Sequence, residues 1–106
     1  MKIDFPPIPK DEFVIYAKLQ ATPNNGDQLE HHLRKLIRLT EKEAGTLDYV
    51  ISRDPESTDT FHVYEKYTGR VAFEKHIGAK EFIDFAESGL LAEQPRPKML
   101  KPLPPL

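Results

Sequence analysis

The sequence predicts an α+β domain of the ferredoxin-like type, an antiparallel sheet with the chain order β-α-β-β-α-β. Three observations lead to this prediction. Segments rich in β-branched and aromatic residues alternate with two helical patterns, a hairpin-type loop joins the second and third strands, and prolines gather at the two ends. With 106 residues, the chain has room for one domain with one hydrophobic core.

The first half of the domain is predicted to be a strand followed by a helix. Residues 13–21 are rich in β-branched and aromatic types and end at a Pro-Asn-Asn-Gly turn. Asp27 is the candidate N-cap of a helix over residues 28–44. Side chains at i, i+4 and i+7 in that helix define one buried face: Leu29, Leu33, Leu36, Ile37 and Thr40.

Two strands, a second helix and a short strand make up the second half. Residues 46–53 and 60–67 have the composition of strands, and the polar residues between them are typical of a hairpin loop. A helix over residues 70–88 is expected to break near Gly78, because glycine is a poor helix former. A fourth strand is expected within residues 96–101.

Prolines indicate where the folded unit begins and ends. Of the ten prolines, only Pro23 and Pro55 lie between residues 10 and 94. Because proline donates no backbone hydrogen bond, we expect an extended arm over residues 1–11, the domain over 12–101 and a proline-rich tail over 102–106. Both ends carry apolar residues, so they are expected to lie along the domain or along a neighbouring subunit.

The predicted strands are apolar or aromatic at most positions, which bears on the oligomeric state. An antiparallel sheet with one solvated face would alternate apolar and polar residues instead. The two helices cover one face, and the chain has no third helix for the other. We therefore expect a homodimer that buries the second face of the sheet.

Composition excludes several classes of function. The net charge of −2, without a basic patch, argues against nucleic-acid binding. The absence of cysteine excludes disulfides, thiolate catalysis and iron–sulfur clusters. No apolar run is long enough for a signal peptide or a membrane span, so we expect a cytoplasmic protein without a membrane partner. Motifs for nucleotide binding, serine hydrolysis and zinc proteases are absent.

Four short motifs then follow one another without large insertions. Residues 43–49 have the form E-x-G-x-x-x-Y, Asp54-Pro55 starts the hairpin, and residues 61–67 have the form F-x-x-x-E-x-Y. The predicted second helix has the form A-x-x-x-H followed by aromatic residues: Ala72, Phe73, His76, Phe82 and Phe85. In this order the motifs resemble the antibiotic biosynthesis monooxygenase family over roughly residues 12–88, with Tyr67 where the family usually has tryptophan.

The resemblance implies a dimeric α+β barrel that oxidises small phenolic, quinol or polyketide-type molecules with O₂ and without a metal, flavin or other cofactor. Such chemistry is intelligible, because a deprotonated phenol can itself pass an electron to O₂ while the protein binds the anion, excludes water and orients the ring. The haem-degrading members use an asparagine, a tryptophan and a histidine whose positions here hold other residues. We therefore do not expect haem degradation.

The resemblance and the side-chain chemistry together nominate site residues. The candidate catalytic residues are His76, Tyr67 and His62, since imidazole titrates near neutral pH and phenols donate to a developing negative charge. The candidate substrate-binding residues, with no metal ligand among them, are Tyr64, Tyr49, Arg53, Phe73 and Phe82.

Purely structural roles for these residues stay open as alternatives. His76 fits a structural bridge between helix and strand equally well, and Phe73 and Phe82 are spaced for burial in the core. Glu65 is interpreted as a structural or dimer-contact residue rather than a base. The alternation of the third strand puts His62 and Tyr64 on one face and Glu65 and Tyr67 on the other, without deciding which face lines a cavity.

Two other functions keep the same fold. One is an isomerase, cyclase or lyase that needs acid–base groups and no O₂, and the other is a non-catalytic homodimer that binds a small molecule. Dependence on oxygen separates the first of these from an oxygenase. Loss of activity in His76→Ala without loss of folding separates both enzymes from the binding protein, because fold alone does not determine function.

Overall fold

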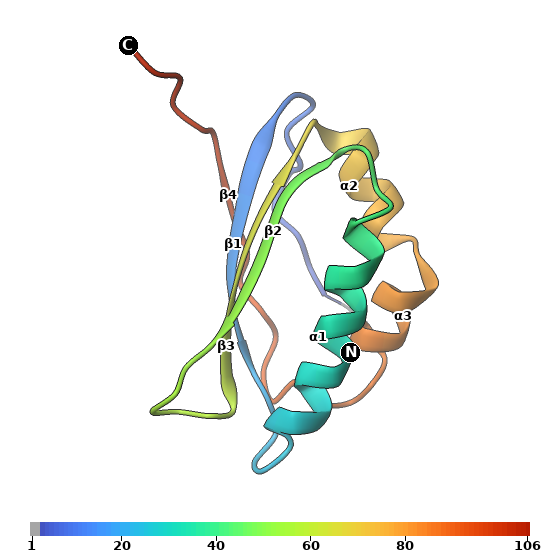
Figure 1. The fold of residues 1–106 in the computed structure, drawn as a ribbon, viewed down its shortest axis with the longest axis vertical. Coiled ribbons are helices and arrows are strands. Elements are labelled where there is room, and N and C mark those ends of the chain that lie inside the picture. Colours follow the sequence, from blue (N-terminus) through green and yellow to red (C-terminus); the bar gives the residue numbers. More distant parts are fainter. Residues whose placement is uncertain (1–2) are drawn as a thin grey trace.

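The element order matches the predicted one. In this computed structural model, which describes residues 3–106, the elements are β1 (Phe13–Gln20), α1 (Gly26–Thr40), β2 (Thr46–Arg53), β3 (Thr60–Tyr67), α2 (Arg70–Ile77), α3 (Lys80–Ala86) and β4 (Lys98–Leu100). The strands form one antiparallel sheet in the order β2-β3-β1-β4. All helices lie on one side of it (Figure 1). The ferredoxin-like α+β prediction is confirmed.

The first helix begins and ends earlier than the predicted 28–44. It spans Gly26–Thr40, its N-cap residue is Asn25, and Asp27 lies inside the first turn, where a carboxylate suits the helix dipole. The N–H of Gly26 donates to Asp59 Oδ1 over 3.0 Å. The start of this helix is therefore capped by a side chain from the β2–β3 hairpin, a contact that local sequence does not reveal.

The second half agrees closely with the sequence analysis. Strands β2 and β3 have the predicted bounds, and the hairpin loop lies between them. The second helix is broken at the expected place, with α2 ending at Ile77, Gly78 as its C-cap and α3 beginning at Lys80. The fourth strand has only three residues within the predicted 96–101.

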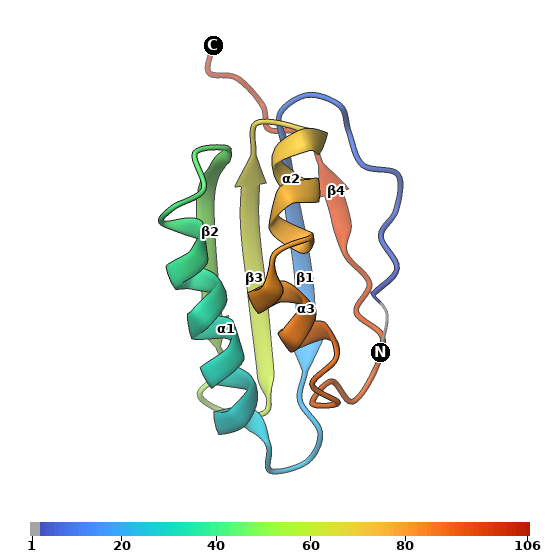
Figure 2. The ribbon, with the colours of Figure 1, turned by 90° about the vertical axis from the view of Figure 1, so that its right-hand side faces the viewer.

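The core lies between the helices and the inner face of the sheet, by which we mean the face that the helices cover (Figure 2). Alternate side chains of β1 and β3 point into it and meet apolar residues of α1, α2 and α3. The buried residues that form this core include Phe13, Ile15, Leu19, Leu29, Leu33, Leu36, Phe61, Val63, Phe73 and Phe85. Each such side chain contributes about 1.5–3 kcal/mol on burial, so this layer dominates the stability of the fold.

No helix among the described residues covers the outer face of the sheet (Figure 1). Tyr64, Val50 and Leu100 point to this side and are 43%, 54% and 47% exposed. Exposed apolar side chains gathered on one face are typical of an interaction surface. The homodimer expected from this feature stays a prediction.

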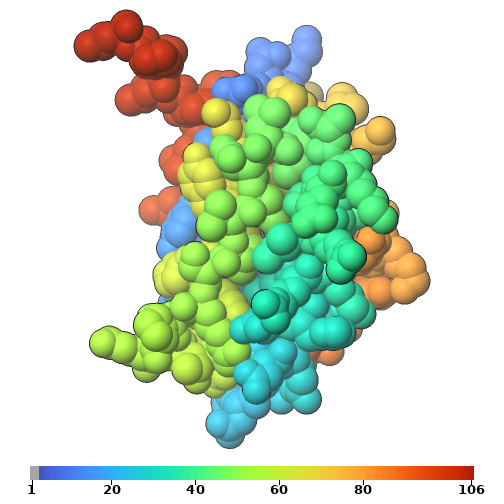
Figure 3. Space-filling model, viewed as in Figure 1, coloured from blue at the N-terminus to red at the C-terminus, as the bar shows by residue number. Residues whose placement is uncertain are grey.

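The two ends of the chain differ in how they meet the domain. Residues 3–12 have no helix or strand and run beside β4 on the helix side, with Ile3, Phe5 and Ile8 packed on the core (Figure 2). Lys101 still donates to the backbone oxygen of Glu12, whereas residues 103–106 are exposed and stand clear of the body (Figure 3). Met1 and Lys2 of the expected arm lie outside the described residues. No helix within residues 3–106 is long and apolar enough to cross a membrane.

Candidate functional site

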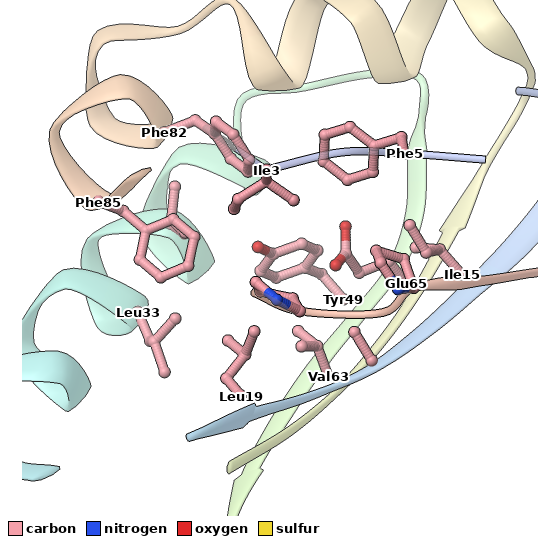
Figure 4. A pocket seen from close by; sticks show the side chains of 14 residues that line it. Ile3, Phe5, Ile15, Leu19, Leu33, Tyr49, Val63, Glu65, Phe82 and Phe85 are labelled. Carbon is pink, nitrogen blue, oxygen red and sulfur yellow. The ribbon is translucent and has the colours of Figure 1, made fainter. Parts of the chain in front are cut away.

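A small cavity lies between the inner face of the sheet and the helices. Its free volume is about 40 Å³, which holds a few water molecules but no aromatic ring. Strands β1, β2 and β3, helices α1 and α3, the N-terminal arm and the segment before β4 all contribute to its wall. Its lining residues are Ile3, Phe5, Ile15, Ala17, Leu19, Leu33, Leu36, Tyr49, Val63, Glu65, Phe82, Phe85, Pro95 and Pro97 (Figure 4).

Two lining side chains are polar, Tyr49 and Glu65, and they are neighbours. The two residues are directly paired across β2 and β3, so their side chains project from adjacent positions of the inner face. Figure 4 shows the phenol and the carboxylate among otherwise apolar groups. An apolar cavity with a few convergent polar groups is the usual form of a small-molecule site.

Glu65 has a strong hydrogen-bond donor behind it. The hydroxyl of Tyr67, two residues along the same face of β3, donates to Glu65 Oε1 over 2.5 Å. Burial raises the pKa of Glu65 to about 7, although this hydrogen bond acts in the opposite direction. Burial and the adjacent carboxylate raise the pKa of Tyr67 far above its ordinary value. Near neutral pH, Glu65 therefore exchanges its proton while Tyr67 stays a donor.

His76 of α2 is completely buried and is held by a second carboxylate. Its Nδ1 lies 2.9 Å from Glu43 Oε1, and the same oxygen accepts a hydrogen bond from the hydroxyl of Thr46. Burial lowers the pKa of His76, against the opposing effect of Glu43, so the ring is neutral at pH 7. Because a carboxylate accepts, we assign the proton to Nδ1, which leaves Nε2 as an acceptor.

The acceptor nitrogen of His76 has no hydrogen-bond partner among the described residues. The imidazole ring centre lies 5.2 Å from that of Tyr49, 5.7 Å from that of Tyr67 and 5.7 Å from that of Phe82. A buried acceptor without a partner costs free energy, and such groups are characteristic of functional sites. We call Glu43, Tyr49, Glu65, Tyr67 and His76 the buried polar cluster; Tyr67 and His76 are fully buried, and the other three are half-buried.

The structure brings together most of the predicted site residues. Tyr67 and His76 meet in the buried polar cluster, and Tyr49 and Phe82 line the cavity beside it. Phe73 lies against Tyr67, with 5.1 Å between the ring centres, but does not line the cavity. Five of the eight nominated residues thus come from four different elements to one side of the sheet.

His62, Tyr64 and Arg53 are placed elsewhere. His62 and Tyr64 point to the outer face of the sheet, where His62 Nδ1 lies 2.7 Å from the hydroxyl of Tyr16. Arg53, at the end of β2, pairs with Asp27 and Glu30 of α1 at 2.9 and 3.0 Å. Side chains alternate between the two faces of a strand, so His62 and Tyr64 lie on the face away from the cavity. The ion pairs with α1 hold the Arg53 side chain away from it.

Two carboxylates that the structure puts in the site, Glu43 and Glu65, were not among the predicted site residues. Glu43 appeared only as the first residue of a motif, and Glu65 was interpreted as structural. The sequence did carry a signal for Glu65, which shares its strand face with Phe61, Val63 and Tyr67. An ionisable side chain on an otherwise apolar face is costly to bury, so such residues are often found in functional sites. Residues 3–106 contain no group of three or more His, Cys, Asp or Glu side chains that could hold a metal ion.

The fold and site define a class of protein: a single-domain ferredoxin-like α+β protein with an apolar cavity and buried acid–base groups between its sheet and helices. The sequence matches the profile of the antibiotic biosynthesis monooxygenase family over residues 12–88. The chain therefore belongs to that family. No curated protein sequence matches it.

Solved structures from several bacteria share the fold. PA3566 from Pseudomonas aeruginosa superposes with a TM-score of 0.81 at 26% identity, covering 90% of this chain and 97% of the other. Rv0793 from Mycobacterium tuberculosis gives 0.77 at 22% identity, with 89% and 97% covered. A protein from Nitrosomonas europaea, described as a candidate antibiotic biosynthesis monooxygenase, gives a TM-score of 0.79 at 15% identity, with 91% of this chain and 94% of the other covered.

Proposed function

We propose that this protein is a cofactor-independent monooxygenase that oxidises a small phenolic, quinol or polyketide-type molecule with O₂. One observation carries the proposal: the buried polar cluster, with Glu65 poised to exchange a proton, lies against a cavity that is otherwise apolar. Membership of the family supports the reaction type. The absence of a cofactor is part of the proposal and follows from the resemblance.

The proposed reaction starts with proton transfer to Glu65, which lines the cavity and titrates near neutral pH. The substrate anion then passes one electron to O₂, and the radical pair combines to form a C–O bond. The peroxide takes the proton from Glu65 and loses water. For a methylene carbon the balance is R₂CH₂ + O₂ → R₂C=O + H₂O, so four electrons reduce O₂ and no other reductant is needed.

Two phenols and an imidazole support this step. Tyr49 lines the cavity, and its pKa is raised well above its ordinary value by burial and by the charges of Glu65 and Glu43, so it donates to the substrate oxyanion. Tyr67 stabilises the ionised form of Glu65. His76 lies behind the cavity wall and acts as a positioning residue for the two tyrosine rings rather than as the base.

The test compares turnover in air and under nitrogen. We expect anthrone or a hydroquinone to be oxidised in air, with O₂ consumed in proportion, and Glu65→Gln to lose at least 100-fold in kcat, the order of effect of a general base. Glu56→Gln, the same change in the exposed hairpin loop, is the matched control and keeps full activity. Equal turnover by Glu65→Gln and the wild type contradicts the assigned role.

A reaction without O₂ is the second candidate, because the buried polar cluster supplies acid–base groups and nothing that is specific to oxygen chemistry. Turnover that continues under nitrogen identifies an isomerase, cyclase or lyase. Tight binding of a small aromatic molecule without turnover in either atmosphere identifies a non-catalytic binding protein.

The functional unit we propose is a homodimer that buries the outer face of the sheet. The exposed side chains of Val50, Tyr64 and Leu100 on that face support it. Light scattering is expected to give twice the chain mass for the wild type and the chain mass for Val50→Lys, which puts a charge beside Tyr64 on that face. Lys42→Ala, on the exposed turn after α1, is the control. A monomeric wild type contradicts the proposal.

A further inference from the structure

The N-terminal arm puts an aromatic ring into the wall of the cavity. The Phe5 ring packs edge-on against Phe73, with centres 5.0 Å apart and planes at 87°, and lies 6.4 Å from Phe82. Ile3 and Phe5 both line the cavity, and Figure 4 shows the two side chains between Phe82 and Glu65. Phe5 therefore has the contacts that a bound aromatic ligand would make.

A second, larger hollow lies on the other side of the arm. It has a volume of about 540 Å³, and Ile77, Ile83 and Ala86 of the two short helices line it. Ile3, Phe5 and Phe82 line this groove as well as the inner cavity. The arm is therefore the partition between the small inner cavity and a groove that is open to solvent.

The arm is anchored firmly at one end. Arg70 donates from Nε and Nη2 to the carbonyl oxygen of Ile8 at 3.0 and 2.8 Å, and its backbone N–H donates to Lys10. Gly69 allows this approach, because a Cβ there would lie 2.3 Å from the Lys10 oxygen. Nearer the N-terminus, an exposed hydrogen bond of 3.3 Å joins Asp4 to Gln94.

The proline content of the arm favours movement of the arm as a rigid segment. Pro6, Pro7 and Pro9 fix their own backbone angles and donate no hydrogen bonds, so the segment ahead of Lys10 is stiff and has few backbone ties to break. The family match covers residues 12–88, so the arm lies outside the part of the chain that matches the family.

We propose that Phe5 occupies an aromatic subsite of the binding pocket, and that a planar aromatic ligand takes this subsite when the arm swings out from its Arg70 anchor. The inner cavity and the groove then join into one pocket large enough for fused rings. The arm competes with the ligand for this subsite. The apparent affinity for the ligand is therefore the affinity of the open form multiplied by the fraction of molecules whose arm is open. The inference rests on the proposed function for the identity of the pocket.

Binding of 1-naphthol, a planar two-ring phenol, tests the inference without any turnover. We expect weak binding to the wild type and an affinity on the order of tenfold higher for Phe5→Ala, because the competing ring is gone. Arg70→Gln, which loosens the anchor, is expected to bind a few-fold more tightly. Lys75→Gln, a change of an exposed cation on the same helix, is the control and is expected to bind as the wild type does.

A second measurement reports the arm itself. At saturating naphthol, the amide signals of Ile3, Asp4 and Phe5 in the wild type are expected to lose the shifts of the packed arm and move to positions typical of solvent-exposed residues. Circular dichroism confirms that each variant is folded, and Phe5→Leu, which keeps an apolar side chain without a ring, replaces Phe5→Ala if the latter does not fold. Unchanged or weaker binding by the Phe5 variants, or an arm that stays packed at saturation, overturns the inference.

The two proposals fail separately. If the Phe5 variants bind naphthol more tightly but no substrate is turned over, the subsite stands and the oxygenase function is wrong. If substrates are oxidised while changes at Phe5 and Arg70 leave naphthol affinity unchanged, the oxygenase function stands and the subsite is wrong.

Discussion

The two faces of the sheet show how one strand supplies two different chemical environments. On the inner face of β3, Val63, Glu65 and Tyr67 meet the helices, while His62 and Tyr64 lie on the outer face, which no helix within residues 3–106 covers. Two adjacent residues of this strand, such as Tyr64 and Glu65, therefore lie in different surroundings, whereas Glu65 shares its surroundings with Tyr49 of another strand. The lesson is that position on the pleat, rather than residue type, decides which ionisable groups are perturbed.

Each face carries one phenol that is hydrogen-bonded to an ionisable group. On the inner face, the fully buried Tyr67 donates over 2.5 Å to Glu65, which is half-buried, and desolvation of Glu65 raises its pKa to about 7. On the outer face, the Tyr16 hydroxyl lies 2.7 Å from His62 Nδ1, and both residues are only partly buried. The two pairs allow the same substitution to be compared in two environments.

The largest expected effect comes from truncating an aromatic ring on each face. Phe61→Ala removes a fully buried ring and is expected to lower the free energy of unfolding by about 3–5 kcal/mol. Tyr64→Ala is expected to lower it by less than about 1 kcal/mol at high dilution. Urea denaturation at two protein concentrations checks both values. An effect of Tyr64→Ala that grows with concentration sharpens the comparison, because it shows a second copy on the outer face.

The next effect is a pH dependence that belongs to the inner face. The pKa of Glu65 rises from 4.5 to about 7 on folding, so the folded state binds more protons in this range and its stability falls as pH rises from about 4.5 to 7. Glu65→Gln has no carboxyl group to titrate. Its free energy of unfolding, relative to that of the wild type, is therefore expected to increase by up to about 3 kcal/mol as pH rises from about 5 to about 8.

The lowered pKa of His76 changes the stability in the opposite direction. As pH falls below 6.5, the unfolded state binds a proton at this residue more readily than the folded state does, so the folded state loses stability. Glu65→Gln and the wild type share this contribution, so it largely cancels in their difference. Thermal unfolding of both proteins across the pH range measures the difference. A difference that does not change with pH shows that the carboxylate is hydrated in the folded state.

The smallest expected effects come from removing one phenol oxygen on each face. Tyr67→Phe removes a fully buried hydroxyl and leaves Glu65 without its donor, and is expected to cost about 1–3 kcal/mol, whereas Tyr16→Phe is expected to cost about 1 kcal/mol or less. Guanidinium denaturation at pH 8 resolves the two. Equal losses would contradict the view that the faces differ in dielectric environment.

The sequence was sufficient for features set by local chemistry. Strands β2 and β3 and the break at Gly78 were predicted well, because turn residues and alternation are encoded nearby. The start of α1 was not, because Asp59 from a distant hairpin caps it. The chemistry of Glu65 was missed for a related reason: its pKa depends on how deeply helices bury it, which a strand pattern does not state.

The contacts of the arm also set the order in which the molecule can be assembled. Ile8 is joined to a residue 62 positions later, and Asp4 to one 90 positions later, so the arm is synthesised well before the residues that hold it in place. Contacts of such long range form late, since the intervening chain must first be ordered. The arm is therefore expected to close over the cavity only after the sheet and the helices have formed.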